Sequence, residues 1–271
     1  VKDAIQAMRE LPAPGKVTVR GELVHNPVVI DELTARGFHQ QKESQRGILP
    51  ATEEVLITAH GTSNTEKERL KALGYTVHDT TCPLVRRAHK AALHYSKRGY
   101  FIIVIGKRGH VEVEGLSGDL LHHAVVSHPE EIESYGAEKI AVVNQTTTRP
   151  DDLLRFHRRI GELNTGIETV FVDTTCQPTR DRQDAVHELV RRVEALVVVG
   201  GPNSNNTLQL GQVATQSGIP WWRVTTAADL KDEWFTGIRI VGLTAGTSTT
   251  DETVREVARA LRRFKSRKLT A

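Results

Sequence analysis

Short apolar runs alternate with amphipathic stretches of helical period along the whole chain. Brief runs rich in Val and Ile predict buried strands, whereas apolar residues that recur every three to four positions predict helices. Strands alternating with helices of this length predict an α/β protein built from parallel sheets. We expect strands at 55–58, 100–105, 139–143, 168–172, 195–199 and 238–243. We expect helices at 1–11, 64–73, 84–98, 151–163, 180–193, 208–217 and 251–263.

The tetrapeptide Asp-Thr-Thr-Cys occurs twice and ends at Cys82 and at Cys176, the two cysteines of the chain. Each copy follows a short apolar run and is followed within two residues by proline. The separation of 94 residues suits a lobe of about four strands with crossover helices. We therefore expect three pseudo-symmetric α/β lobes with small parallel sheets. These are 1–81, 82–175 and 176–250, followed by a C-terminal helix and basic tail at 251–271.

The first expected lobe differs from the other two at its start. It begins with a predicted helix, and neither a strand nor a cysteine precedes that helix. We expect that the N-terminal strand of this lobe is missing from the chain. We also expect the C-terminal tail to pack on this lobe.

Polar, glycine-containing turns follow several of the predicted strands. Ligands of parallel sheets bind beyond the carboxyl ends of the strands, so these turns are candidate site elements. Glycine lets the backbone approach a ligand closely, and a following helix N-terminus favours an anion. Simple helix capping explains any one such turn, but the series beside two cysteine turns favours a ligand site. The turns are 59–63, 106–112, 144–148, 200–207 and 244–250.

The turn at 200–207 is the most polar of the series. Its four consecutive polar residues, Asn203, Ser204, Asn205 and Asn206, exceed what one helix cap requires. It lacks the Gly-Lys-Ser/Thr of a Walker A loop and the pattern Gly-x-Gly-x-x-Gly. We interpret it as a phosphate cradle without lysine, which suits a small diphosphate better than a nucleotide.

Three histidines in loop positions, His25, His60 and His110, are further candidates. Imidazole carries charge near neutral pH and suits a diphosphate. Glu112 beside His110 forms a candidate acid/base or proton-delivery pair, and a surface pair at a helix start is the alternative. The same residues resemble the start of a zinc-deaminase motif, but the chain has no Cys-x-x-Cys, which excludes that class.

Composition is that of an ordinary soluble globular protein, with 38% hydrophobic and 25% charged residues. No apolar run approaches the roughly 20 residues that span a membrane. Two cysteines in 271 residues fit a reducing cytosol, with a Cys82–Cys176 disulfide as the alternative. The net charge of +3 is too small to indicate nucleic acid by itself.

A basic cluster near the C-terminus contributes to this charge. It is either a solvated helix end, whose cations suit the helix dipole, or a docking patch for an acidic protein. Its members are Arg262, Arg263, Lys265, Arg267 and Lys268.

A series of short motifs occurs in the order and approximate spacing of one enzyme family. In the first half they are Glu22-Leu23-Val24-His25-Asn26, Ala59-His60-Gly61, Asp79-Thr80-Thr81-Cys82-Pro83-Leu84-Val85 and His110-Val111-Glu112-Val113-Glu114-Gly115. In the second half they are Asn144-Gln145-Thr146-Thr147, Thr174-Thr175-Cys176, Asn203-Ser204-Asn205-Asn206 and Thr244-Ala245-Gly246-Thr247-Ser248. On these motifs the chain resembles the 4-hydroxy-3-methylbut-2-enyl diphosphate reductases, the LytB family, over essentially its whole length.

The resemblance implies a trefoil-like arrangement of the three lobes around a central site. It also implies an iron–sulfur cluster, of the 4Fe–4S type in the active form, held by three cysteines, one from each lobe. Cys82 and Cys176 match the second and third of these ligands. The first belongs to a Cys-x-Gly-Val motif whose valine matches Val1, so we expect it three residues upstream of Val1.

The implied reaction is the reductive dehydroxylation of 4-hydroxy-3-methylbut-2-enyl diphosphate to isopentenyl and dimethylallyl diphosphate. This is the last step of the non-mevalonate isoprenoid route. Glu112 matches the proton source, and His110 and Thr146 match residues that assist it. The residues that match the substrate-binding set are His25, His60, His110, Thr146, Ser204, Asn205, Asn206 and Ser248.

The resemblance also implies partners and a compartment. An external electron donor, ferredoxin or flavodoxin, is required, because the cluster transfers single electrons. We expect a cytoplasmic monomer or homodimer that uses neither nucleic acid nor a membrane.

Two other functions fit the same residues. One is a cluster-free diphosphate-binding protein derived from the reductase and inactive without the first cysteine. The other is a zinc hydrolase that uses Cys82, Cys176 and a histidine.

Overall fold

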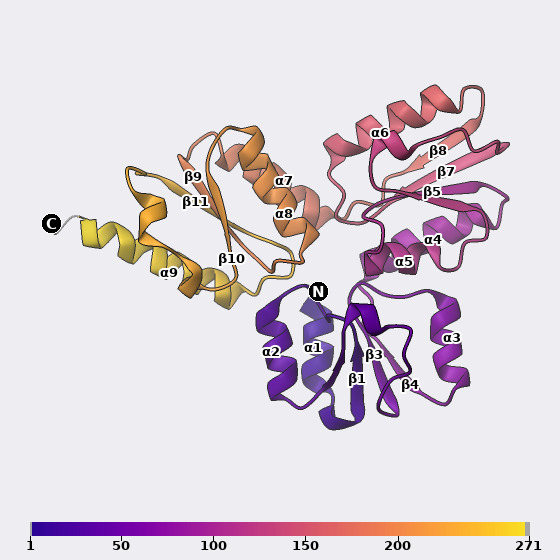
Figure 1. The fold of residues 1–271 in the computed structure, drawn as a ribbon, viewed down its shortest axis with the longest axis horizontal. Helices are drawn as coiled ribbons and strands as arrows, with labels where there is room; N and C mark the ends of the chain where they lie inside the picture. Colours follow the sequence, from indigo (N-terminus) through magenta and orange to yellow (C-terminus); the bar gives the residue numbers. More distant parts are fainter. Residues whose placement is uncertain (1, 269–271) are drawn as a thin grey trace. The chain divides into compact units, whose positions relative to one another are not determined.

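The computed structural model describes residues 2–268, with side chains described for residues 2–263. Val1 lies outside the described residues. The expected basic cluster is described only in part, because the side chains of Lys265, Arg267 and Lys268 are outside this range. The described residues form an α/β fold with three small sheets, in which every strand pairing is parallel. This confirms the predicted fold class (Figure 1).

The first two sheets have four strands each and the same order. The first is β2-β1-β3-β4 and the second β6-β5-β7-β8. The strands of the first are β1 (Val17–Arg20), β2 (His39–Gln41), β3 (Glu54–Ile57) and β4 (Thr76–Asp79). Those of the second are β5 (Phe101–Ile105), β6 (His123–Val126), β7 (Lys139–Asn144) and β8 (Glu168–Val172).

The third sheet has the order β10-β9-β11. Its strands are β9 (Ala195–Val199), β10 (Trp221–Val224) and β11 (Val241–Ala245). The α-helices are α1 (Lys2–Glu10), α2 (Pro27–Ala35), α3 (Asn64–Ala72), α4 (Pro83–Ser96), α5 (Val111–Ser117), α6 (Pro150–Leu163), α7 (Gln177–Leu189), α8 (Asn205–Gln216) and α9 (Asp251–Lys268). Short 3-10 turns lie at Pro14–Lys16, Glu43–Gln45, Pro129–Glu131, Ala227–Asp229 and Asp232–Phe235.

The second sheet is covered on both faces, and this explains why its two central strands, β5 and β7, are largely continuous apolar runs. Ile102 and Val104 pack with Ala88 of α4 and Leu116 of α5. The alternate residues of β5, such as Ile103, point to the other face and pack against α6. Figure 1 shows α4 and α5 on one side of this sheet and α6 on the other.

The third sheet is covered in the same way. Val198 packs with α7 and α8 on one face, and Val197 packs with Val257 of α9 on the other. The helical part of the C-terminal segment therefore packs on the third sheet, whereas we expected the tail on the first lobe. Residues 269–271 lie outside the described part of the chain.

The chain divides into two compact units. The first contains Val1–Val24 and Glu32–Cys176, and the second contains His25–Asp31 and Gln177–Ala271. The first two expected lobes thus fall within one unit. The short segment that begins at His25 groups with the third sheet instead of with the first lobe.

Some predicted elements are displaced. The last predicted strand, at 238–243, is β11 and begins only at Val241, because the Glu194 carboxylate accepts hydrogen bonds from the N–H groups of Arg239 (2.6 Å) and Ile240 (3.3 Å). Helix α7 begins at Gln177, before the predicted start at 180, since proline is tolerated in a first helical turn. Helix α8 begins at Asn205, which places part of the most polar turn inside its first turn.

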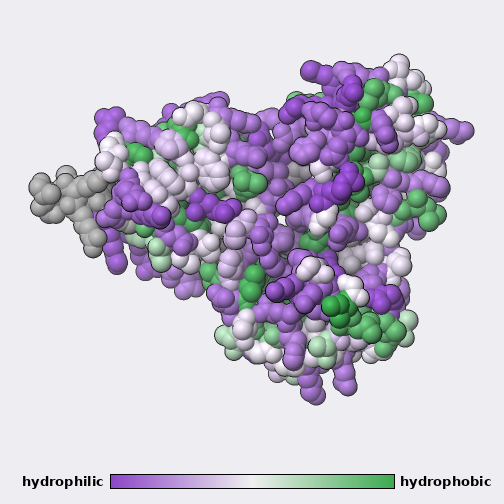
Figure 2. Space-filling view, viewed as in Figure 1, coloured by the Kyte–Doolittle hydropathy of each residue, from purple (hydrophilic) through white to green (hydrophobic). Residues whose placement is uncertain are grey.

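The surface in view is mostly hydrophilic, and its hydrophobic residues occur in small groups (Figure 2). Within the described residues, none of the helices combines the length and apolar character required to cross a membrane.

Ile160 and Leu154 lie on α6 and provide a matched test of its buried face. Ile160 is fully buried, whereas Leu154 is 67% exposed. We expect Ile160→Ala to lower the free energy of unfolding by about 2–5 kcal/mol, because it leaves a cavity beneath the sheet. Leu154→Ala should change it by about 0.5 kcal/mol or less. Urea denaturation measures both, and equal effects would contradict this orientation of α6.

Candidate functional site

The first Asp-Thr-Thr-Cys copy forms a tight turn between β4 and α4. Asp79 Oδ1 accepts hydrogen bonds from the Thr81 hydroxyl and from the Thr81 N–H, the latter at 3.0 Å. Lys67 Nζ lies 3.0 Å from Asp79 Oδ2. Burial opposes ionisation of Asp79, but the bonds from Thr81 and Lys67 outweigh it and hold its pKa below the usual value. The ionised carboxylate thus closes the turn that precedes Cys82.

The second copy repeats this turn and adds a buried amide. The Thr175 N–H donates to Asp173 Oδ1 at 2.9 Å. Asn144, at the end of β7, is 2% exposed. Its Oδ1 accepts from the Thr174 N–H at 3.0 Å, and its Nδ2 donates to Thr175 Oγ1 at 2.9 Å. A satisfied buried network of this kind fixes local geometry, so the turn before Cys176 is held to the end of β7.

Both cysteines are anchored to the neighbouring strand in the same way. The Cys82 N–H donates to Ala59 O at 3.0 Å, and the Cys176 N–H donates to Thr146 O at 2.9 Å. Cys82 is the N-cap of α4, and Cys176 immediately precedes α7. A helix N-terminus favours the thiolate, which is the form that binds metals. Both cysteines are partly exposed and neither forms a disulfide, so the disulfide alternative is wrong.

Glu112 lies in the first turn of α5 and is 2% exposed. Its Oε1 accepts from the Thr146 N–H at 2.6 Å. Its own N–H donates to Nδ1 of His110, the N-cap of α5, at 3.1 Å. Because Nδ1 accepts, the neutral His110 ring carries its proton on Nε2. Thr146 therefore connects Glu112 to the second cysteine turn. Its N–H donates to the buried Glu112 carboxylate, and its carbonyl accepts the N–H of Cys176.

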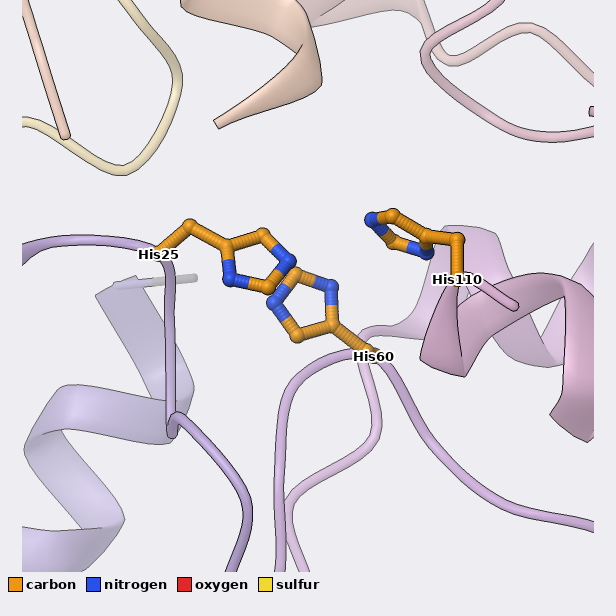
Figure 3. Close-up of side chains that lie close together, drawn as sticks. All are labelled: His25, His60 and His110. Carbon is orange, nitrogen blue, oxygen red and sulfur yellow. The ribbon is translucent and has the colours of Figure 1, made fainter. Parts of the chain in front are cut away.

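His60, after the end of β3, lies against His110. Their ring centroids are 5.5 Å apart, and the rings meet edge to face at 88° (Figure 3). The backbones are close as well, because a Cβ on Gly115 would lie 3.2 Å from Thr62 Cα. Glycine in α5 thus lets the turn after His60 pack directly on this helix.

The second compact unit contains the most polar turn. Ser204 is the N-cap of α8, and its Oγ accepts from the Thr207 N–H at 3.2 Å. Asn205 and Asn206 form the first turn of α8. Asn206 is 2% exposed, and its Oδ1 accepts from the Thr247 N–H at 3.1 Å. Its buried Nδ2 has no acceptor among the described residues, and an unsatisfied buried donor costs about 1–3 kcal/mol.

His25 and Ser248 belong to the same unit. Asn26 Nδ2 donates to Ser248 O at 2.7 Å, and Ser248 Oγ donates to His25 O at 3.3 Å. A Cβ on Gly201 would lie 2.3 Å from His25 O, so only glycine fits there. His25, which Figure 3 also labels, therefore lies beside the turns at 200–207 and 244–250, and not in the first lobe where its position in the sequence places it.

Comparison with known proteins identifies the family. The sequence profile of the LytB protein matches residues 1–262. The chain belongs to the LytB family.

Two relatives are both named 4-hydroxy-3-methylbut-2-enyl diphosphate reductase. The protein of Methylibium petroleiphilum is 36% identical over 261 residues, covering 95% of this chain and 78% of the relative. That of Ectopseudomonas mendocina is 35% identical over 254 residues, covering 91% and 80%.

Solved structures agree with the LytB assignment. The E-1-hydroxy-2-methyl-but-2-enyl-4-diphosphate reductase of Plasmodium falciparum superposes with a TM-score of 0.86 at 25% identity, covering 96% of this chain and 83% of that one. A second structure, of (E)-4-hydroxy-3-methyl-but-2-enyl diphosphate reductase, has a TM-score of 0.67 at 29% identity, with coverage of 97% and 92%.

In this LytB protein, Asp119 links the second expected lobe to the first, a connection that we did not predict. His89 Nε2 of α4 lies 2.9 Å from Asp119 Oδ2. Asp119 also accepts from the N–H groups of Asn64 (2.6 Å) and Thr65 (2.9 Å) at the start of α3. Burial opposes ionisation of Asp119, but these N–H bonds outweigh it and lower its pKa. The carboxylate thus joins the start of α3 to the end of α5, the helix that carries Glu112.

The structural roles of Asn144 and Asn26 were not predicted from the sequence. Asn144 lies two residues before Thr146 in the Asn-Gln-Thr-Thr motif, and Asn26 directly follows His25. An Asn at the end of a strand or before proline is the available signal. It does not specify the partner, which lies 30 residues away for Asn144 and 222 for Asn26.

Asn144→Leu tests the network behind Cys176. The substitution leaves the Thr174 N–H and the Thr175 hydroxyl without their buried partner. We expect the free energy of unfolding to fall by about 2–4 kcal/mol. Asn64→Ala, at an exposed side chain of α3, is the control and should change it by about 0.5 kcal/mol or less. Urea denaturation provides the measurement, and a loss no larger than the control's would contradict the network.

Stability should depend on two histidines with lowered pKa values. Burial lowers the pKa of His89 and of His157, and Asp119 and Asp173 respectively only partly oppose it. The unfolded chain takes up these protons near pH 6.5, above the folded-state pKa values. The contribution of these two histidines to the free energy of unfolding is therefore fully present above about pH 6.5. It is lost as the pH falls from that value through the lower pKa values of the folded protein.

We expect the urea midpoint to decrease between about pH 7.5 and about pH 5.5. The His89→Gln/His157→Gln double variant should show a flatter dependence over that range. An unchanged slope in the variant would assign the effect to other groups.

Proposed function

We propose that this LytB protein reduces 4-hydroxy-3-methylbut-2-enyl diphosphate to isopentenyl and dimethylallyl diphosphate, the last step of the non-mevalonate isoprenoid route. The substrate loses its allylic hydroxyl as water and takes up two electrons and two protons. The observation that carries the proposal is the double hydrogen bond of Thr146, to the buried Glu112 carboxylate and to the N–H of Cys176. The candidate acid and the candidate metal ligand are thus both hydrogen-bonded to the same residue, Thr146.

The donor set suits an iron–sulfur cluster. Two cysteines outside any disulfide, Cys82 and Cys176, lie at helix N-termini in repeated turns, and thiolates are typical cluster ligands. We infer a 4Fe–4S cluster for which Cys82 and Cys176 are ligands. When bound, the cluster supplies one-electron transfer and Lewis-acid iron.

The chain's own residues then handle protons. Glu112 holds the proton that the substrate receives, and the Thr146 N–H fixes the position of its Oε1. His110 uses Nδ1 to accept the Glu112 N–H, so its Nε2 proton is available to an anionic oxygen. His60, edge to face with His110, adds a second imidazole to the same unit.

The second unit suits the diphosphate. The buried Asn206 Nδ2 needs an acceptor, and the N-terminus of α8 favours an anion. We infer that Ser204, Asn205 and Asn206 bind phosphate oxygens there, together with His25 and Ser248. No lysine is required, because amide, hydroxyl and imidazole donors act together.

Electrons come from a separate protein in this proposal, a ferredoxin or a flavodoxin. Proteins of both kinds are generally acidic, so a basic surface of the enzyme favours their binding. We infer a cytoplasmic enzyme that acts as a monomer or homodimer.

Glu112→Gln is the decisive variant. Gln keeps an acceptor for the Thr146 N–H but has no acidic proton, so turnover should fall at least about 100-fold while substrate still binds. Glu114→Gln, at an exposed position two residues away, is the matched control and should behave as wild type. Both are assayed with the protein, as its gene encodes it, after anaerobic reconstitution with iron and sulfide and with dithionite as reductant.

Metal analysis of the same preparations separates the competing functions. Iron with acid-labile sulfide and product formation support the reductase. Zinc without sulfide would favour the hydrolase, and tight diphosphate binding without iron would favour the cluster-free binding protein. Near-normal turnover of Glu112→Gln would remove Glu112 from the proton-donor role.

A further inference from the structure

The segment from Thr80 to Val111 carries only positively charged residues among its Lys, Arg, Asp and Glu positions. It contains seven lysines and arginines and no aspartate or glutamate, although the whole chain has a net charge of only +3. Helix α4 lies within this segment. A long one-sign segment inside a nearly balanced chain creates a local positive field. The seven cations are Arg86, Arg87, Lys90, Lys97, Arg98, Lys107 and Arg108.

Helix α4 separates its apolar and basic residues by face. Ala88 and Ala92 are fully buried against the second sheet. Arg87 and Lys90 are exposed, and their spacing of three residues places them on the same side of the helix. The outer face of α4 therefore carries cations, while its inner face holds the helix on the sheet.

This basic face begins at a candidate cluster ligand. Cys82 is the N-cap of α4, and its carbonyl accepts the Arg86 N–H at 3.0 Å. One helical turn rises about 5.4 Å, so Lys90 lies about two turns along the helix from Cys82. A protein bound to this face would be close to the thiol.

The acidic groups near α4 do not neutralise this face. Asp79 is matched by two cations, with Lys67 Nζ at 3.0 Å and Arg86 at 3.5 Å. Asp119 meets α4 at His89, which is buried. Neither carboxylate has a described ion pair with Arg87 or Lys90.

The helix after the second cysteine has no such face. Along α7, Arg180 and Arg182 alternate with Asp181 and Asp184. In addition, Arg182 Nε donates to Ala245 O at 3.1 Å within the chain. Of the two helices that begin at a cysteine, α4 alone offers a surface of one sign.

We propose that the exposed face of α4, defined by Arg87 and Lys90, is the docking surface for an acidic electron-carrier protein that delivers electrons near Cys82. The proposal rests on the proposed reductase function and specifies where its partner binds. Charge complementarity accelerates the encounter of such partners. Weak redox complexes also use small interfaces, for which one helix face is large enough.

Arg87→Gln/Lys90→Gln tests the surface, and the chain offers a matched control. Arg155 and Arg158 on α6 are also exposed and have the same spacing of three residues, so Arg155→Gln/Arg158→Gln removes the same charge elsewhere in the same compact unit. The probe is an acidic ferredoxin, titrated by calorimetry against each protein at about 20 mM and at about 200 mM salt. Circular dichroism compares the folding of the variants.

We expect the α4 variant to bind the ferredoxin about threefold to tenfold more weakly than wild type at the lower salt concentration. The difference should shrink at the higher salt concentration, because salt screens exposed charges. The charge-conserving Arg87→Lys/Lys90→Arg variant should bind as wild type. Turnover with dithionite should be unchanged, while turnover with ferredoxin should fall in the α4 variant alone.

Each other outcome has a defined meaning. Wild-type affinity of the α4 variant would overturn the proposal, and so would an equal loss in the α6 control. A loss confined to Arg262→Gln/Arg263→Gln would place docking at the C-terminal basic cluster instead and would also overturn it. Absence of dithionite turnover in wild type would count against the reductase function, whereas the binding titration judges the docking surface independently.

Discussion

The anchoring of each cysteine turn to the strand beside it is the constraint on which the rest of the site depends. Both cysteine N–H groups donate to a carbonyl just past β3 or β7, and both turns are closed by an aspartate. A buried N–H that loses its partner lowers the free energy of unfolding by about 1–3 kcal/mol. These hydrogen bonds therefore hold both cysteines at the sheet edges. The same strand ends carry His60 and Thr146. Anchoring the cysteines therefore also sets their relation to the polar chemistry within the first unit.

Thr146 shows how closely the groups of that unit are coupled. Its N–H holds a buried carboxylate on α5, and its carbonyl holds the turn before α7. The second unit is organised differently. Its polar residues lie around the N-terminus of α8, where the buried Asn206 Nδ2 has no acceptor among the described residues. In the proposed reaction, one unit supplies the thiolates and the proton donor, and the other binds the anion.

Much of the fold followed from periodicity. The strand expected at 195–199 coincides with β9, because buried parallel strands are continuous apolar runs and β9 is buried throughout. The strand expected at 168–172 coincides with β8, an edge strand that is only partly buried. Short elements such as β2 and α5 were not predicted, since three to seven residues are too few to show a clear hydrophobic periodicity. The displaced start of β11 depends on the Glu194 carboxylate, a side chain outside the strand, and no local pattern encodes that interaction.

The sequence by itself identified the candidate site residues and their positions relative to a strand end or a helix start. The Asp-Thr-Thr-Cys repeat and the polar turns are local, and local hydrogen bonds such as Thr81 to Asp79 follow from them. Only the tertiary structure decided which of these positions meet. His25 joins the third sheet because Asn26 bonds Ser248, 222 residues away. Such contacts form only when whole sheets have packed, so no window of sequence contains them.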